Sequence, residues 1–303
     1  MRVGLYLIFS EAALVICWSS GFIGAKLASS TPSVFLVLFW RFVISSVVLL
    51  PFVVSSLRRG ASFRDIRLQA VIGAFAMFGY LAFGVKGVDL GVPLGTAALI
   101  SALQPLVTAV LVGVLLNEAV RGRQWIGLAL GFLGVLCAVA GSLGFAQPWA
   151  FSFPLLSMFS IVADTILAKR IQRPEEAASL STLAVIGVQS ATSTVLFAPL
   201  ALADGTLMPE LTGDFVYAVA WFILFSTIGG YGFYWLCLKN GTATRVASLI
   251  YLTPPVISIW AWLMFGEPIA GMTLAGFVFC LAGVWLAGDR RGIFREISTA
   301  REA

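Results

Sequence analysis

The sequence is poor in the residues that most catalytic and metal sites need. It has no histidine, and only 11% of its 303 residues are charged, against about 25% in soluble domains. Histidine is the commonest general base and the commonest neutral metal ligand. The strings GxSxG, GxxxxGK[ST] and HExxH are also absent. We therefore expect no catalytic residue, no metal site and no cofactor, and the sequence does not favour an enzyme.

The few cysteines form no motif. Cys17, Cys137, Cys237 and Cys280 each stand alone inside an apolar stretch. None belongs to a CxxC pair that could bind zinc or cycle between thiol and disulfide. We expect all four to be small packing residues.

Apolar residues are what the sequence has in excess. They make up 60% of the chain, aromatic residues make up 13%, and the mean hydropathy is +0.99. Such a chain is not disordered, and its unbroken apolar runs do not fit the alternating strands of a β-barrel. A membrane-spanning helix needs about 20 apolar residues. The sequence therefore predicts an all-α polytopic membrane protein with ten transmembrane helices. The expected spans are 5–25, 34–56, 68–87, 93–116, 124–143, 149–168, 179–202, 214–237, 246–265 and 270–288.

The lysines and arginines predict how these helices are oriented. If the N-terminus is cytoplasmic, sixteen of the 19 lie in segments on the inner side, and only Lys26 and Lys86 lie in outer ones. Cytoplasmic loops of membrane proteins are enriched in Lys and Arg, so both termini are expected in the cytoplasm. The net charge of +5 then reflects orientation, and we expect no nucleic-acid partner.

The two halves of the sequence are similar to each other. Residues 97–105, AALISALQP, match residues 247–255, ASLIYLTPP, and Glu118 matches Glu267 at nearly the same offset. Each half holds five expected helices, and an odd number makes the second half enter the membrane upside down. We therefore expect two inverted five-helix repeats. The expected divisions are 1–143 for the first repeat, 144–288 for the second and 289–303 for a basic cytoplasmic tail.

Three segments carry a resemblance to a known family. They are CWSSGFIGAKLA at 17–28, LLNEAVRGRQWIGLALGFLGV around Glu118 and MFGEPIAGMTLAGFVFCLAGV around Glu267. Together they resemble the EamA branch of the drug/metabolite transporter superfamily, over nearly the whole chain. The resemblance implies a ten-helix transporter of the cell inner membrane, usually an exporter of small metabolites. It also implies a central cavity built mainly from helices 1, 3, 4, 6, 8 and 9, and it does not fix the substrate.

Aromatic and amide side chains on those cavity helices are the candidate substrate contacts. For each aromatic residue the alternative is packing, or anchoring at the membrane surface. The tyrosine hydroxyls and a neutral amide near the midplane need hydrogen-bond partners, which favours a place facing the cavity. The candidates are Trp18, Phe22, Tyr80, Gln104, Tyr231 and Tyr251.

Prolines fall near the middle of two expected spans. Pro105 and the Pro254–Pro255 pair each remove a backbone hydrogen bond and disturb the preceding turn. The freed carbonyls must be satisfied by neighbours, water or substrate. We expect structural kinks at these positions, which either serve packing alone or help to form the substrate site.

Charged residues inside the spans are the remaining candidates, because an unpaired charge in hydrocarbon costs about 2.5–3.5 kcal/mol or more. Glu11 shares a helix face with Trp18 and is the candidate for proton coupling. The alternative is an acid that pairs with a loop arginine. Asp164 needs a cation such as Lys169, Arg170 or Arg41, or a proton, and we expect structural pairing; for Arg41 we expect a structural tie.

Other charged and small residues are expected to serve the fold. Lys26 and Lys86 stand at outer helix ends, where lysine side chains snorkel to the membrane surface. Glu118 and Glu267 close equivalent short turns, and we expect them to cap or pair within those turns. A glycine stripe allows close helix contact, either within the monomer or at a dimer face, so a monomer and a homodimer both remain open. The stripe consists of Gly127, Gly131 and Gly134, mirrored by Gly276 and Gly283.

These observations predict a transporter of small neutral or zwitterionic metabolites such as amino acids, working by alternating access around a midplane cavity. Few charges lie in the spans, which does not favour organic anions. The expected partners are a small-molecule substrate, the lipid bilayer and, if transport is coupled through Glu11, protons; a facilitator without an ion fits equally well. The alternatives are a lipid or amphiphile flippase and a non-transporting membrane subunit.

The expected orientation can be tested by chemical labelling. In a cysteine-free variant, a single cysteine replaces Ser62 or Leu207. Because 62 lies in an expected inner loop and 207 in an outer one, only the second should react with an impermeant maleimide added to intact cells. Equal labelling at both positions, or labelling at 62 alone, would contradict the topology.

Overall fold

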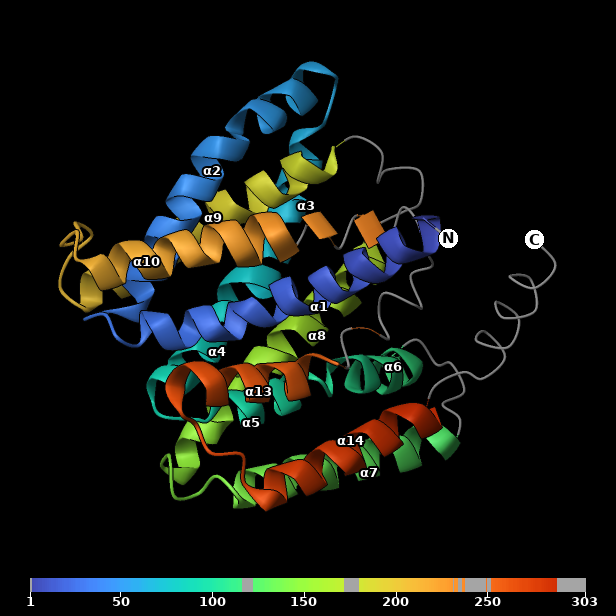
Figure 1. The fold of residues 1–303 in the computed structure, drawn as a ribbon. Coiled ribbons are helices and arrows are strands. Elements are labelled where there is room, and N and C mark those ends of the chain that lie inside the picture. Colours follow the sequence, from blue (N-terminus) through green and yellow to red (C-terminus); the bar gives the residue numbers. More distant parts are fainter. Residues whose placement is uncertain are drawn as a thin grey trace.

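The computed structural model describes residues 2–115, 122–171, 180–230 and 252–287, together with the short pieces 232–233, 236–237 and 249. Helices joined by short turns make up these ranges (Figure 1). Tyr231, Tyr251, Glu118 and the expected tail at 289–303 lie outside the described residues.

The helices follow the expected spans along both halves of the chain. The first half contains α1 (Arg2–Ala28), α2 (Val34–Arg58), α3 (Phe63–Gly73), η1 (Ala74–Gly79), α4 (Tyr80–Asp89), α5 (Leu94–Ser101), α6 (Gln104–Leu115) and α7 (Gly122–Ala140). The second half contains η2 (Pro148–Phe151), α8 (Ser152–Ile171), α9 (Thr182–Ala203), α10 (Gly213–Trp221), η3 (Phe222–Gly230), α13 (Thr253–Phe265) and α14 (Gly271–Ala287).

Six of these helical stretches are long and apolar enough to cross a membrane, and four further apolar helices are shorter. The six are Phe9–Ala28, Val34–Arg58, Phe63–Asp89, Pro148–Leu167, Thr182–Ala203 and Gly213–Gly230. The all-helical membrane class is therefore confirmed. The count of ten spans and the inversion of the second repeat remain predictions.

The prolines expected to bend two spans lie in the first turns of helices. The span expected at 93–116 is interrupted at Ala102 and Leu103, and α6 then begins at Gln104 with Pro105 second. Pro254 and Pro255 occupy the same place in α13. In a first turn the missing proline N–H removes no helical hydrogen bond. Each proline position thus starts a new helical segment.

Two π-helical segments, η1 and η3, were not predicted. They occupy equivalent places in the two halves, each continuing a helix toward the middle of the bundle. In η3 the Thr227 hydroxyl donates a hydrogen bond to the Phe222 carbonyl, five residues earlier, at 3.2 Å. A π-helical turn holds extra residues, so it re-aims the side chains that follow it, and such turns are frequent at functional sites.

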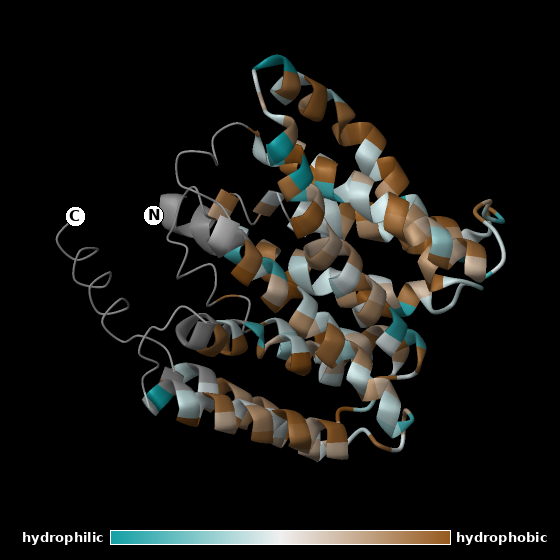
Figure 2. Ribbon diagram, turned by 180° about the vertical axis from the view of Figure 1, so that it is seen from behind, coloured by the Kyte–Doolittle hydropathy of each residue, from teal (hydrophilic) through white to brown (hydrophobic). Residues whose placement is uncertain are grey.

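The helices form an elongated bundle with α7 and α14 side by side along one edge and α2 and α9 along another (Figures 1 and 2). Figure 2 shows apolar residues along the outer helices and hydrophilic ones at the turns between them. Between the two edges lie α1, α4, α8 and α10 with η3. The principal apolar core joins this middle layer to α2, with Phe42, Phe197 and Phe222 almost completely buried.

The glycine stripe is used for contact between α7 and α14 within one chain. A Cβ atom added at Gly134 would lie 2.7 Å from the Gly276 carbonyl oxygen, and one added at Gly276 would lie 2.6 Å from the Gly134 carbonyl oxygen. At Gly283 the added atom would meet the Gly127 carbonyl oxygen. The backbones therefore touch, and these glycines face each other within the monomer, which leaves no glycine dimer face at this stripe.

Substitution at this contact should destabilise the protein. Gly134→Ala would force two backbones apart, and overpacking of this kind costs about 1–3 kcal/mol, although alanine is the better helix former. Gly271→Ala on α14 is a matched control, because nothing lies within 4 Å of its added Cβ. We expect a lower melting temperature in detergent for Gly134→Ala only. An unchanged value would mean that α7 and α14 are not tightly packed.

Candidate functional site

A cavity of about 290 Å³ lies in the middle layer of the bundle. Its walls come from α1, α2, η1, α4, α5, α8, α9 and η3. The volume is near the lower end of the roughly 300–1,000 Å³ range of small-molecule sites. The cavity also mixes apolar rings with hydroxyl, amide and charged groups, as sites for small polar ligands do.

Three of the expected substrate contacts lie on the wall of this cavity. Trp18 and Phe22 reach it from α1, and Tyr80 reaches it from the first residue of α4, directly after η1. Gln104 is partly buried at the start of α6 and is not among the lining residues. Substrate binding by these residues stays a prediction, as does any role of the two tyrosines outside the described residues.

Hydroxyl groups from the second half of the chain form much of the polar wall. Ser157 of α8 donates a hydrogen bond to the Tyr80 carbonyl oxygen at 2.6 Å and so ties α8 to α4. Ser190 and Ser226 line the cavity from α9 and η3. Gln189 also lines it, while its amide donates to the Gln69 side chain at 3.1 Å.

Arg41 lies on the wall of the cavity, where the sequence indicated only a structural tie. Its side chain is 4% exposed, and Nη2 donates to Ser226 Oγ at 3.4 Å and Thr227 Oγ1 at 3.3 Å. The guanidinium carbon lies 4.6 Å from the centre of the Phe222 ring and 5.2 Å from that of Phe42. Aromatic faces attract cations, so rings and hydroxyls together fix the position of this charge.

Asp164 also faces the cavity, from α8. The sequence favoured pairing with a nearby cation. The structure records no hydrogen bond or ion pair between Asp164 and any of the side chains it describes, which exclude that of Lys169. Arg41 and Asp164 are the two charged residues among the described residues of the wall.

The candidate for proton coupling lies elsewhere. Glu11 is partly buried on α1, seven residues before Trp18, and is not among the residues that line the cavity. Helical spacing correctly places the two on one face of α1. Spacing alone does not show how far along that face the cavity extends.

At one end of the bundle an ion pair joins α1 to the turn that follows α13. Lys26 Nζ of α1 lies 3.0 Å from Glu267 Oε1, and Glu267 Oε2 accepts a hydrogen bond from the Leu94 backbone N–H at 3.0 Å. Leu94 is the first residue of α5, where a carboxylate is favoured by the free N–H groups and the helix dipole. Glu267 therefore pairs beyond its own turn, and snorkelling of Lys26 stays a prediction.

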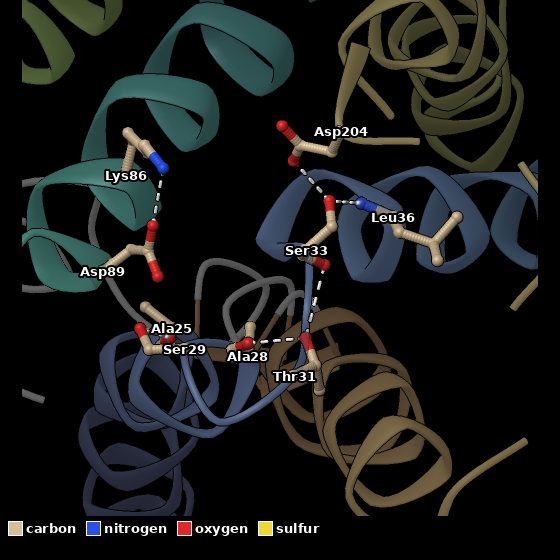
Figure 3. Close-up of polar contacts among 9 residues, drawn as sticks. All are labelled: Ala25, Ala28, Ser29, Thr31, Ser33, Leu36, Lys86, Asp89 and Asp204. Atoms are coloured by element: carbon tan, nitrogen blue, oxygen red, sulfur yellow. Dashed lines mark hydrogen bonds and ion pairs between the residues drawn. The ribbon is translucent and has the colours of Figure 1, made fainter. Parts of the chain in front are cut away.

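Further polar contacts join helices at this same end (Figure 3). Ser33, the N-cap of α2, donates to Asp204 at the end of α9 at 2.5 Å, and the Trp40 indole donates to the Leu207 carbonyl oxygen at 2.8 Å. Lys86 pairs with Asp89 of its own helix at 2.7 Å. Contacts between both halves of the chain thus hold helices together at this end, which we call the Lys26 end.

In the part of the chain that the structure describes, six long apolar helices and a central cavity of mixed polarity form the architecture of a membrane transporter. The chain belongs to the EamA-like transporter family, whose sequence model matches residues 4–140 and again residues 148–288. It is therefore a multi-pass membrane transporter built from two tandem repeats of that family.

Curated relatives carry compatible names. A "Probable amino-acid metabolite efflux pump" of Salmonella typhimurium is 29% identical over 221 residues, which cover 71% of this chain and 74% of that protein. The "Uncharacterized inner membrane transporter YedA" of Escherichia coli is 24% identical over 272 residues, covering 90% and 85%. A solved crystal structure aligns with a TM-score of 0.59 at 19% identity over 93% of this chain and 97% of that one, which shows a shared fold.

Proposed function

We propose that this protein exports small neutral or zwitterionic metabolites, such as amino acids, across the inner (cytoplasmic) membrane by alternating access. The two halves, 1–143 and 144–288, act as inverted five-helix repeats that rock around the cavity, with both termini in the cytoplasm. The efflux pump among the relatives supports an amino-acid substrate. The relative named as an inner membrane transporter supports the location.

The observation that carries the proposal is the composition of the cavity wall. Trp18 and Tyr80 come from the first half of the chain, and Ser157 and Ser226 come from the second. Substrate sites of transporters built from inverted repeats lie at the interface between the repeats, near the middle of the membrane. A site shared between halves changes its access when one half moves against the other.

The size of the cavity favours a small metabolite over the flippase alternative. At about 290 Å³ it is slightly below the usual range for drug-sized ligands, roughly 300–1,000 Å³. A membrane lipid with two acyl chains is larger than such ligands. The aromatic wall of Trp18 and Phe22 fits an apolar side chain, and the hydroxyls and charges opposite fit polar groups.

The start of α6 supports movement. The chain is interrupted there at Ala102 and Leu103, so α6 can tilt relative to α5, and α13 begins at the equivalent position of the second half. Hinges are commonly the ends of helical elements. The driving force stays open between a proton gradient, with Glu11 as one candidate carboxylate, and a facilitator that needs no ion.

Transport can be measured by counterflow of radiolabelled leucine and phenylalanine in proteoliposomes. We expect saturable counterflow, and a loss of about five- to thirtyfold for Trp18→Ala, because a lost aromatic contact of about 1–2 kcal/mol corresponds to that factor. Trp262→Ala is the matched control, because Trp262 is 55% exposed on the outside of α13. Lipid scrambling without any counterflow of amino acids would favour the flippase.

The Lys26–Glu267 pair should stabilise the state in which the Lys26 end is closed. A partly exposed ion pair contributes up to about 1 kcal/mol, so Lys26→Met should raise the open population up to about fivefold. The measurement is the rate at which an impermeant maleimide in the external medium labels a cysteine placed at Ser45 in a cysteine-free variant.

The matched control for this experiment is Lys86→Met. Lys86 pairs with Asp89 on its own helix and lies 5.7 Å from the centre of the Phe35 ring of α2, so its removal breaks no ion pair between the two halves. We expect wild-type labelling rates for this variant. Equal rates in Lys26→Met and Lys86→Met would show that the Lys26–Glu267 pair does not control access to the cavity.

A further inference from the structure

The cavity carries one positive and one negative group on different helices. Arg41 faces it from α2 in the first half of the chain, and Asp164 faces it from α8 in the second. Each lies in a helical stretch long and apolar enough to cross a membrane. Because a charge placed inside a membrane costs about 2.5–3.5 kcal/mol or more, such residues face water or a partner and mark substrate pathways.

Asp164 is the more informative of the two. Its carboxylate makes no hydrogen bond or ion pair with the side chains that the structure describes. Among the described residues, no contact therefore offsets the free-energy cost of removing this carboxylate from water. A carboxylate facing a cavity of low dielectric attracts a cationic group far more strongly than it would in water.

Arg41 has a fixed place on the wall. The Phe222 and Phe42 rings lie near its guanidinium, and the Ser226 and Thr227 hydroxyls receive hydrogen bonds from one of its amino groups. These contacts orient the planar group through uncharged neighbours. An oriented guanidinium can bind a carboxylate through two parallel hydrogen bonds.

A comparison of the two halves indicates that neither charge is needed for the fold that the halves share. Arg41 matches Gln189, and in the register that pairs the first helices of the two halves, Asp164 matches Gly21. Both neutral counterparts also line the cavity. The same place on the wall is thus charged in one half and neutral in the other, as a site for an asymmetric ligand requires.

We propose that the cavity recognises a zwitterion by its two charges, the substrate carboxylate at Arg41 and the substrate ammonium at Asp164. The inference rests on the proposed function and adds to it the residues that select the substrate. Trp18 and Phe22 then contact the apolar side chain. Metabolites that lack one of the charges lose one of the two contacts.

The test compares free leucine with N-acetyl-leucine, which lacks the ammonium, and leucinamide, which lacks the carboxylate. Each competes with radiolabelled leucine for counterflow in proteoliposomes. For the wild type we expect inhibition constants at least tenfold higher for both derivatives. Asp164→Asn should abolish the discrimination against N-acetyl-leucine and keep that against leucinamide, and Arg41→Gln should do the reverse.

Conservative variants and an exposed acid provide the controls. Asp164→Glu and Arg41→Lys keep the charges and should retain the wild-type order of the three compounds. If a neutral variant does not fold, these two variants still test the proposal. Asp164→Glu changes the length of the acidic side chain and should weaken the contact with the substrate ammonium, and Arg41→Lys should weaken the contact with the substrate carboxylate. Asp214→Asn, at an exposed position in the first turn of α10, should leave all three inhibition constants unchanged.

The outcomes separate the two proposals. A wild-type protein that exchanges no amino acid overturns the proposed function. A wild-type protein that exchanges leucine but accepts N-acetyl-leucine or leucinamide equally well overturns the two-charge site alone. The two-charge site is also overturned if Asp164→Asn and Arg41→Gln both fold and still discriminate against N-acetyl-leucine and leucinamide.

Discussion

The requirement that backbone and side-chain polar groups be satisfied inside the membrane governs this structure. In hydrocarbon no water replaces a missing hydrogen bond, so most of the backbone must be helical. The irregular backbone at Ala102–Leu103 lies within the bundle, and its N–H groups still bond to the Ala98 and Ile100 carbonyls. Irregularity is tolerated at this depth only where protein or a cavity surrounds it.

The same requirement sorts the many serines and threonines into two groups. Ser46, Thr165, Thr192 and Ser193 each donate to the carbonyl four residues earlier in their own helix and need no other partner. Others, such as Ser45 and Ser190, face the cavity with Arg41 and Asp164. Part of the polarity that is not used within the helices thus lies on the wall of the cavity, which is where a polar solute can be accommodated inside a membrane protein.

The sequence was sufficient for the class of protein, the tandem repeats and most helix boundaries, because these follow from apolar runs, glycines and prolines. The sequence predicted the residues of the cavity wall less well. Helical periodicity shows which residues share a face of one helix, but not which neighbouring helix or cavity that face contacts. The π-helical turn of η1 re-aims the chain just before Tyr80, and the break at Ala102–Leu103 interrupts the face on which Gln104 was placed. Arg41 and Asp164 were recognised as unusual, but only the assembled bundle shows that they share a cavity.

The carboxylate of Glu267 also joins helices of both repeats. It follows α13, accepts a hydrogen bond from the backbone of the first residue of α5 and forms an ion pair with Lys26 of α1. At Gly95 even a methyl group would overlap Ser258 of α13, so α5 and α13 are closely fitted to each other. One of these helices belongs to the first repeat and the other to the second. Tight helix packing at this end therefore crosses the boundary between the two repeats instead of stopping at it.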